Sequence, residues 1–273
     1  VQGFPVESPW PRSCKLPENV TRPSTLRGLV AAVLLAVLGC GAPYYEPFDS
    51  RSHLEAQIES RLLGTGIEPG AVRAPFALDD ELRALVEERI QLSGGEPWRV
   101  DQILDLIFSR LELEYSLDPT RSAIETFQAR EGNCLSFVNL FVGIGRERKL
   151  NPFYVEVEDY NRWKYQNGSV ISAGHIVAGL YVNGDLKTYD FLPYRAKSYR
   201  DFEPIDDLKA TAHYYNNLGA EALLDGETER AHDLLRIAVA LAPDFPKAVN
   251  NLGVSLLRMG RVDDALAVYL KGL

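Results

Sequence analysis

Three residues far apart in the sequence, Cys134, His175 and Asp190, have the side chains that a thiol enzyme needs. A cysteine nucleophile requires a lowered thiol pKa, a base that handles protons, and a group that orients this base. Cys134 begins a segment with helical apolar spacing, and Asn133 is the expected N-cap. The unpaired amides at the start of such a helix favour a thiolate and are suited to stabilise an oxyanion.

The histidine and the aspartate lie on two apolar stretches separated by Asn183-Gly184, which is typical of a tight β-hairpin. A loop of two or of four residues places Asp190 opposite Val177. Since alternate residues of a strand face the same side, His175 and Asp190 become diagonal neighbours, with Cβ atoms about 7–8 Å apart or less. A hydrogen bond can bridge this distance, whereas a slip of one residue would separate the two side chains.

Each of the three residues also has an interpretation without chemistry. Cys134 lies on an apolar helical face, where cysteine is commonly a small buried hydrophobe. A histidine in a strand is often a hydrogen-bonded core residue, and an aspartate near a strand end is often a solvated cap. The register that brings His175 beside Asp190, taken together with Cys134 at a helix start, favours catalysis over these separate explanations.

Three segments resemble motifs of the transglutaminase-like superfamily, and they occur in the same order. Residues 129–137 (AREGNCLSF) resemble its nucleophile motif, residues 172–177 (SAGHIV) its histidine strand, and residues 189–191 (YDF) its aspartate strand. The upstream segment 113–127 also resembles bacterial members. The resemblance covers about residues 78–194.

This resemblance implies an α+β fold with a papain-like core, in which the cysteine helix packs on an antiparallel sheet. It assigns Cys134 as nucleophile, His175 as base and Asp190 as the residue that orients the base. In this superfamily an upstream side chain often completes the oxyanion hole. Gln128 is the candidate for that role here, and a plain surface position is the alternative.

Three further residues are candidates for lining a substrate cleft: Asn133 beside the nucleophile, and Trp163 and Tyr165 in a loop expected before the histidine strand. Packing roles explain the two aromatic residues equally well. No cofactor and no metal are expected. The sequence has no calcium loop of EF-hand type, and one cysteine with one histidine gives too few ligands for zinc.

The first 39 residues are predicted to be the leader of an exported lipoprotein. The apolar run Leu29–Leu38 is too short for the roughly 20 residues of a membrane-spanning helix, and it fits the apolar part of a secretory signal. It is followed by Gly39 and Cys40, an ending that resembles a bacterial lipobox. Cys40 is therefore the expected lipidation site, and a chance cysteine in a core helix is the alternative. Residues 1–19 do not resemble a signal, so we expect translation to begin at a non-ATG codon or near Val20.

The rest of the chain divides into three expected parts: a tether that partly docks (40–77), the transglutaminase-like domain (78–203) and an all-α region (204–273). In the last part, Asn-Leu-Gly at 217–219 recurs at 251–253, an offset of 34 residues. This period and these residues resemble tetratricopeptide (TPR) repeats. Only two units are present, and such repeats usually need about three. We therefore expect the first unit to pack on the catalytic domain, or the chain to be truncated or joined by a partner.

Composition limits the remaining classes of function. Apolar residues make up 46% and charged residues 25% of the 273, an ordinary globular balance. The formal net charge of −9 and the lack of a basic run exclude nucleic acid as a partner. The expected partners are a protein or peptide substrate, a protein bound by the repeats, and the membrane that holds the lipid anchor.

The leading hypothesis is an exported, lipid-anchored thiol enzyme of the bacterial cell envelope. It would cleave or transfer at amide, isopeptide or peptide bonds through an acyl-enzyme on Cys134. Gly41, rather than aspartate, follows Cys40, which favours the periplasmic side of the outer membrane over the inner membrane by analogy with known lipoproteins. A non-catalytic envelope scaffold that binds a partner through its repeats is the alternative, and acyl transfer from a thioester is a third possibility.

Overall fold

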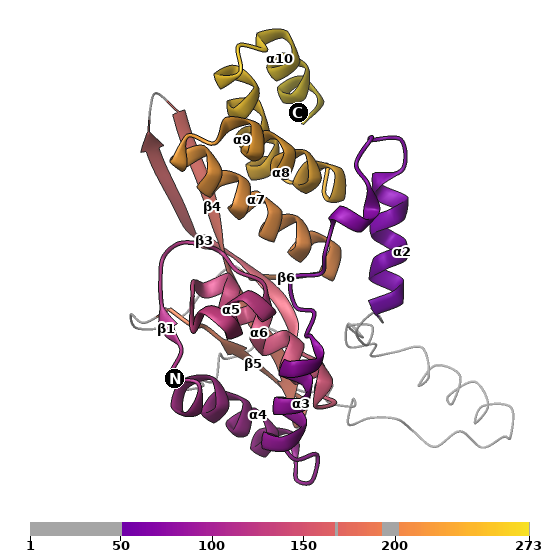
Figure 1. Cartoon of the computed structure of the whole chain (residues 1–273), viewed down its shortest axis with the longest axis vertical. Helices are drawn as coiled ribbons and strands as arrows, with labels where there is room; N and C mark the ends of the chain where they lie inside the picture. Colours follow the sequence, from indigo (N-terminus) through magenta and orange to yellow (C-terminus); the bar gives the residue numbers. More distant parts are fainter. Residues whose placement is uncertain (1–50, 167–168, 193–201, 273) are drawn as a thin grey trace, which may run out of the picture. The chain divides into compact units, whose positions relative to one another are not determined.

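The computed structural model describes residues 51–166, 169–192 and 202–272. They form an α+β fold in which helices pack on a four-stranded antiparallel sheet and are followed by two helical hairpins (Figure 1). The expected leader (1–39) and its lipidation site, Cys40, lie outside the described residues. Within the described ranges no helix is both long and apolar enough to cross a membrane.

Short helices form the N-terminal part of this fold: α2 (Arg51–Leu62), the 3₁₀ turn η1 (Pro69–Ala71), α3 (Asp80–Arg89), α4 (Glu96–Asp105) and the π-helical segment η2 (Leu106–Arg110). Helix α2 lies within the expected tether, but Leu54 and Ile58 are buried in the main core, so this part of the tether is docked. Helix α3 begins where the Asp79 side chain accepts a hydrogen bond from the Leu82 amide at 2.9 Å.

The central helix of the protein is α6 (Cys134–Glu147), which begins at the expected cysteine. It follows β1 (Glu114–Tyr115), α5 (Ala123–Ala129) and β2 (Glu131–Gly132), and β1 and β2 form a two-stranded parallel pair. Nearly every residue of α6 after Cys134 is buried, because other elements cover the helix on all sides.

The sheet contains β3 (Phe153–Gln166), β4 (Ser169–Val182), β5 (Asp185–Tyr189) and β6 (Phe202–Ile205), in the order β5-β4-β3-β6. The Asn183-Gly184 hairpin is confirmed, with Val182 paired to Asp185 and both turn residues at positive φ. Strand β6 is an edge strand that pairs Pro204 with Val155. The boundary expected between residues 203 and 204 therefore cuts through a strand, and the sheet extends to Ile205.

Two helical hairpins complete the chain: α7 (Asp207–Asp225) with α8 (Thr228–Leu241), and α9 (Pro246–Arg258) with α10 (Val262–Lys271). The 34-residue period of the sequence recurs in their packing. A Cβ on Gly219 would lie 2.5 Å from Leu235, and a Cβ on Gly253, 34 residues later, would meet the equivalent Tyr269. Both glycines thus permit close approach of the two helices of a hairpin.

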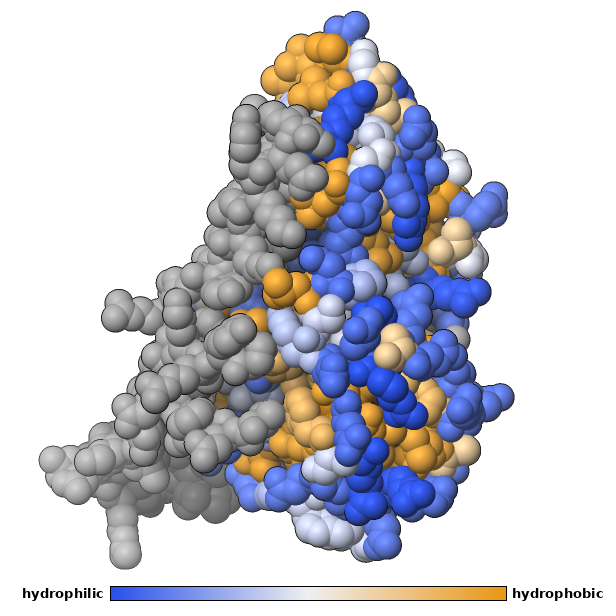
Figure 2. Space-filling model, turned by 60° about the vertical axis from the view of Figure 1, so that its left-hand side comes forward, coloured by the Kyte–Doolittle hydropathy of each residue, from blue (hydrophilic) through white to orange (hydrophobic). Residues whose placement is uncertain are grey.

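Helix α10 leaves an apolar stripe in contact with solvent. Val262, Leu266 and Leu270 follow one another at intervals of four residues and are 61%, 56% and 63% exposed. Figure 2 shows hydrophobic residues gathered at the top of the view, where α10 lies, above a face with many hydrophilic residues. Contiguous exposed apolar surface of this kind is typical of a binding surface.

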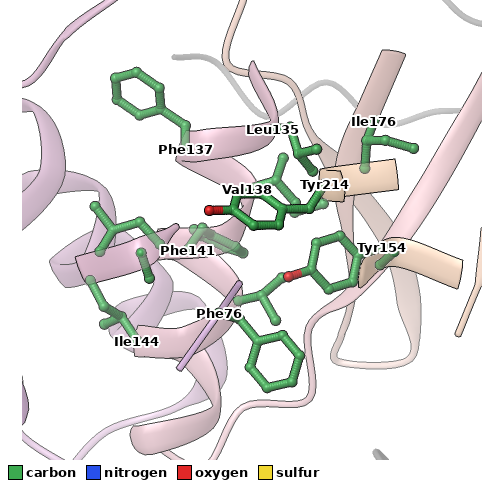
Figure 3. Packing of buried hydrophobic residues seen from close by; sticks show 14 of the residues in the cluster. Phe76, Leu135, Phe137, Val138, Phe141, Ile144, Tyr154, Ile176 and Tyr214 are labelled. Carbon is green, nitrogen blue, oxygen red and sulfur yellow. The ribbon is translucent and has the colours of Figure 1, made fainter. Parts of the chain in front are cut away.

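One continuous core joins α6, the sheet and the first hairpin. Figure 3 shows side chains of α6 packed near Tyr154 and Ile176 of the sheet and near Tyr214 of α7. At the end of α6, Arg146 donates two hydrogen bonds to the Asp207 carboxylate, at 2.8 and 2.9 Å, with both side chains buried. The expectation that the first helical unit packs on the α+β core is confirmed by these contacts.

Candidate active site

The Cys134 thiol lies at the first residue of α6, as the sequence predicts. The Asn133 side chain caps the helix by accepting a hydrogen bond from the Ser136 amide at 3.0 Å. The amides of Cys134 and Leu135 have no carbonyl partner within the helix, because they belong to its first turn. Cys134 is a free cysteine and is partly exposed, which is a poor match for a sealed core residue. Cys134 is therefore partly exposed and lies in the turn whose backbone donors have no partner within the helix.

The imidazole of His175 is brought against a carboxylate by the sheet register. His175 lies on β4 opposite Val157 of β3 and is almost fully buried. Its Nε2 atom lies 3.2 Å from Oδ1 of Asp190, the residue directly after β5. The same Asp190 oxygen accepts a hydrogen bond from the Leu192 amide at 3.0 Å, which holds the carboxylate in place. The predicted diagonal contact across the hairpin is confirmed.

The pKa of His175 shows how the three groups act on one another. Burial disfavours the imidazolium and lowers this pKa, but hydrogen bonds to Asp190 and to Cys134, with the charges of both partners, outweigh burial and raise it to about 9. Since Asp190 takes Nε2, Nδ1 is the ring atom available to Cys134. An imidazolium at neutral pH is the state that stabilises a neighbouring thiolate.

An aromatic cluster fixes the position of Asp190. The next residue, Phe191, packs against Phe137 and Phe141 of α6, each with its ring centroid at 5.7 Å, and against Phe108 of η2 at 6.1 Å. Phe191 is buried, so the chain at the end of β5 is anchored to α6, the helix that begins at Cys134. Packing energy thereby sets the distance between the carboxylate and the helix that carries the thiol.

The weaker site candidates of the sequence lie elsewhere. Asn133 is buried, and its side chain bonds to Ser136 and to Thr120 rather than facing a cleft. Gln128 is exposed on α5, and no hydrogen bond joins its side chain to another described residue. The loop expected around Trp163 and Tyr165 is wrong: both belong to strand β3, opposite Ser172 and Val170 of β4.

A buried polar network next to Cys134 is not predicted from the sequence. Thr120 is fully engaged between Asn133 and Glu221, a residue of α7 that lies 101 positions away in the chain. Ser136 bonds both to Asn133 and to the Arg121 amide at 2.8 Å. The Asn-x-x-Ser spacing at the start of α6 predicts the contact between Asn133 and Ser136. No local pattern in the sequence predicts the contact between Thr120 and Glu221.

Metal ligation has no candidate group in the part of the chain that the structure describes. No three His, Cys, Asp or Glu side chains cluster there in a way that could hold an ion. The groups that meet at Cys134 are a thiol, an imidazole, a carboxylate and backbone amides, a set suited to nucleophilic attack on a carbonyl carbon with proton transfer.

Comparison with known proteins gives no family. No protein-family model matches the chain, and no curated protein matches it either. A solved structure described as a "putative protease" from Parabacteroides distasonis aligns with 56% of this chain at 13% identity and a TM-score of 0.33. The chain spans 32% of that protein's length. We infer neither fold nor function from a similarity of this size.

Proposed function

We propose that this chain is a thiol enzyme of the transglutaminase-like superfamily, with a papain-like core, that acts on amide, isopeptide or peptide bonds. One observation carries the proposal. A partly exposed cysteine at a helix start acts on a buried histidine strongly enough to help raise its pKa, and Asp190 lies 3.2 Å from the Nε2 atom of that histidine. The sequence motifs around these residues support the same conclusion.

In the proposed first step, the Cys134 thiolate attacks the carbonyl carbon of the scissile bond. The carbonyl oxygen becomes an oxyanion, which the amides of Cys134 and Leu135 are suited to stabilise. The His175 imidazolium then donates a proton to the departing amine nitrogen, and the carbon–nitrogen bond breaks. The products of this step are a free amine, a neutral imidazole and a thioester on Cys134.

In the second step, neutral His175 removes a proton from the acceptor, which attacks the thioester carbonyl. A water molecule as acceptor releases a carboxylic acid, and an amine releases a new amide. The proton on His175 and the thiolate of Cys134 are regenerated in both cases. Asp190 holds the imidazole in one orientation through both steps, so that Nδ1 faces the sulfur and the reacting atoms.

Alkylation of the thiol tests this proposal without knowledge of the substrate. Iodoacetamide should modify Cys134 of the folded protein at pH 6–7 much faster than Cys134 of the denatured chain, since only thiolates react. Peptide mass spectrometry separates Cys134 from Cys14 and Cys40. His175→Gln should remove the difference, whereas equal rates in the folded and denatured wild-type protein would sink the proposal.

The reaction itself is tested with a small panel of peptide amides and isopeptides. Turnover of any of them should disappear in Cys134→Ala, and intact-mass spectrometry should detect a thioester adduct on the wild-type protein. Addition of a primary amine separates the two outcomes of the second step. An increase in the amine-linked product supports transfer, and an unchanged yield of free acid supports hydrolysis.

The proposal extends to export and lipid anchoring in the bacterial cell envelope, on the periplasmic side of the outer membrane. It rests on the apolar run Leu29–Leu38 and on Cys40 after Gly39. Metabolic labelling with a radioactive fatty acid should mark the wild-type protein and leave Cys40→Ala unlabelled. Label retained in Cys40→Ala would contradict this part of the proposal.

A second function, binding of a protein partner, is favoured by the exposed stripe of Val262, Leu266 and Leu270. We propose that α7–α10 are two TPR units and that this surface serves binding, alongside catalysis or in place of it. A cellular phenotype that survives Cys134→Ala but is lost on Leu266→Asp would favour the scaffold alone. The opposite pattern would favour the enzyme.

A further inference from the structure

A chain of hydrogen bonds runs from the first helical hairpin to the start of the nucleophile helix. The Glu221 carboxylate on α7 accepts two hydrogen bonds from Thr120, one from the amide at 2.8 Å and one from the hydroxyl at 2.6 Å. The Thr120 hydroxyl oxygen in turn accepts one from the Asn133 side-chain amide at 2.7 Å. Asn133 is the cap of α6, directly before Cys134.

The donors and acceptors along this chain of hydrogen bonds can be arranged in only one direction. Ionised Glu221 can only accept, so the Thr120 hydroxyl proton must point toward it. The threonine oxygen then has only lone pairs for Asn133, which must present its NH₂ group there. The opposite end of the same amide, Oδ1, is thereby turned to Ser136, where it accepts from the backbone amide at 3.0 Å and from the hydroxyl at 2.9 Å. The carboxylate on α7, through Thr120, and the Ser136 amide therefore require the same orientation of the Asn133 side chain.

The middle of this chain of hydrogen bonds is closed to water. Thr120 and Asn133 are 3% and 6% exposed, and Ser136 is fully buried. Water is thus a poor substitute for a lost partner, and each missing hydrogen bond would leave a buried polar group unsatisfied. The orientation of Asn133 depends on the protein groups alone.

The carboxylate is not a requirement of the helical repeat. The position 34 residues after Glu221 is Ser255, whose hydroxyl donates to the Leu252 carbonyl of its own helix at 2.7 Å. Glu221 instead reaches out of its hairpin to the loop before α5. Among the described residues, no lysine or arginine forms an ion pair with Glu221. Burial, with the nearby Asp118 and Asp225, raises the pKa of its carboxyl group. Its donors are those of Thr120.

We propose that Glu221 is a positioning residue for the nucleophile, acting through Thr120 and Asn133 on the amides at the start of α6. The inference rests on the proposed function, because it concerns the reactivity of Cys134. Its consequence is that the first helical hairpin is part of the catalytic machinery. When α7 is in place, the Ser136 amide is taken by the cap, and the Cys134 and Leu135 amides are held toward the sulfur and the expected oxyanion.

Variants of the full-length protein separate the hydrogen-bond chain from simple charge. Thr120→Val keeps the shape and the Glu221 charge but removes the hydroxyl, whereas Thr120→Ser restores it. Glu221→Ala removes the acceptor, whereas Glu221→Gln keeps an acceptor oxygen and removes the charge. Ser255→Ala is the matched control at the equivalent position of the second hairpin. Thermal unfolding of each variant checks that it is folded under the assay conditions.

The readout is the rate of Cys134 alkylation by iodoacetamide as a function of pH. We expect Thr120→Val and Glu221→Ala to react roughly three- to tenfold more slowly at pH 7, the size of effect that loss of a helix cap produces. Their pH midpoints should move upward, because the helix start stabilises the thiolate less. The double variant, Thr120→Val with Glu221→Ala, should react no more slowly than the slower of the two single variants. Thr120→Ser, Glu221→Gln and Ser255→Ala should react like the wild type.

The inference is overturned if folded Thr120→Val or Glu221→Ala alkylates at the wild-type rate with an unchanged pH midpoint. It is also overturned if Ser255→Ala slows the reaction to the same extent, since the effect would then reflect general loosening of the helices. If Cys134 of the wild type reacts no faster than in the denatured chain, the proposed function fails, and this inference fails with it. A fast wild type with fast variants contradicts the inference alone.

Discussion

His175 and Asp190 meet across a β-hairpin, with Nε2 of the imidazole 3.2 Å from Oδ1 of the carboxylate. The contact is set by two independent constraints. The Asn183-Gly184 turn fixes the register of β4 and β5, and Phe191 ties the end of β5 to α6. A hydrogen bond held at both ends in this way orients the ring without any contribution from a substrate. The candidate site is therefore organised before a ligand arrives.

Substitution of Asp190 by asparagine should reduce the reactivity of Cys134 far more than it reduces stability. The amide can donate to Nε2, which favours the wrong tautomer of His175, and a fall of about 10²- to 10⁴-fold in turnover is expected for loss of such a group. Alkylation and turnover should be measured together. Asp185→Asn, at the exposed turn of the same hairpin, is the control and should behave like the wild type. Equal activity of Asp190→Asn and the control would exclude an orienting role.

Stability should depend on pH through His175. Its pKa is raised from 6.5 to about 9 in the folded protein, so protonation stabilises the fold fully below pH 6.5 and the stabilisation is lost as the pH rises through 9. The pH-dependent part should be on the order of 3 kcal/mol between these limits. Urea unfolding of the wild type and of His175→Gln between pH 6 and 9.5 measures it. The difference between the two proteins should shrink with rising pH, and a constant difference would contradict the assigned pKa.

Much of the site could be predicted from the sequence because its constraints are local. The apolar spacing after Asn133 predicts a helix that starts at Cys134, and the Asn-Gly turn predicts the register that joins His175 to Asp190. Both inferences use residues within a few positions of the ones they place. The 34-residue spacing likewise predicts the repeated glycine contacts of the two hairpins.

The rest depends on contacts that no local pattern encodes. Glu221 reaches Thr120 across 101 residues, and a lone glutamate in an amphipathic helix looks like any solvated one. Trp163 and Tyr165 are expected in a loop before the histidine strand, whereas pairing with β4 extends β3 through both residues. Strand β6 was missed because Pro204 suggests a break, but an edge strand tolerates a proline.

Loss of the Glu156 carboxylate should weaken the contact between the sheet and the helical hairpins and so destabilise the protein. Glu156 of β3 lies 3.2 Å from the ammonium groups of Lys209 (α7) and Lys247 (α9), and 3.4 Å from His213. Burial raises its pKa, but these partners outweigh burial and hold the pKa well below its usual range. Glu156→Gln leaves two partly buried ammonium groups without their carboxylate and should lower the free energy of unfolding by about 1–3 kcal/mol.

The same ion cluster predicts acid sensitivity with a defined sign. A carboxylate with a lowered pKa stabilises the fold above pH 4.5, its usual value, and this contribution is lost as the pH falls below it. Urea unfolding between pH 3 and 7 should therefore show a steeper loss for the wild type than for Glu156→Gln. Glu203→Gln, on the exposed residue directly opposite Glu156 on β6, is the matched control and should keep the wild-type profile. Parallel profiles for all three proteins would contradict the role of the cluster.

Close approach of α7 and α8 should depend on the absence of a side chain at position 219. A Cβ on Gly219 would lie 2.5 Å from Cγ of Leu235, a contact that forces the two helices apart. Gly219→Ala should therefore destabilise the protein by about 1–3 kcal/mol, although alanine is the better helix former.

Leu235→Ala should also destabilise the protein, by about 2–5 kcal/mol, through the cavity it leaves. In the double variant the new methyl group occupies part of that cavity, so the combined loss in urea unfolding should be smaller than the sum of the single losses. Additive losses would mean that the two residues do not meet, and the glycine at the same place in the second hairpin would then need another explanation.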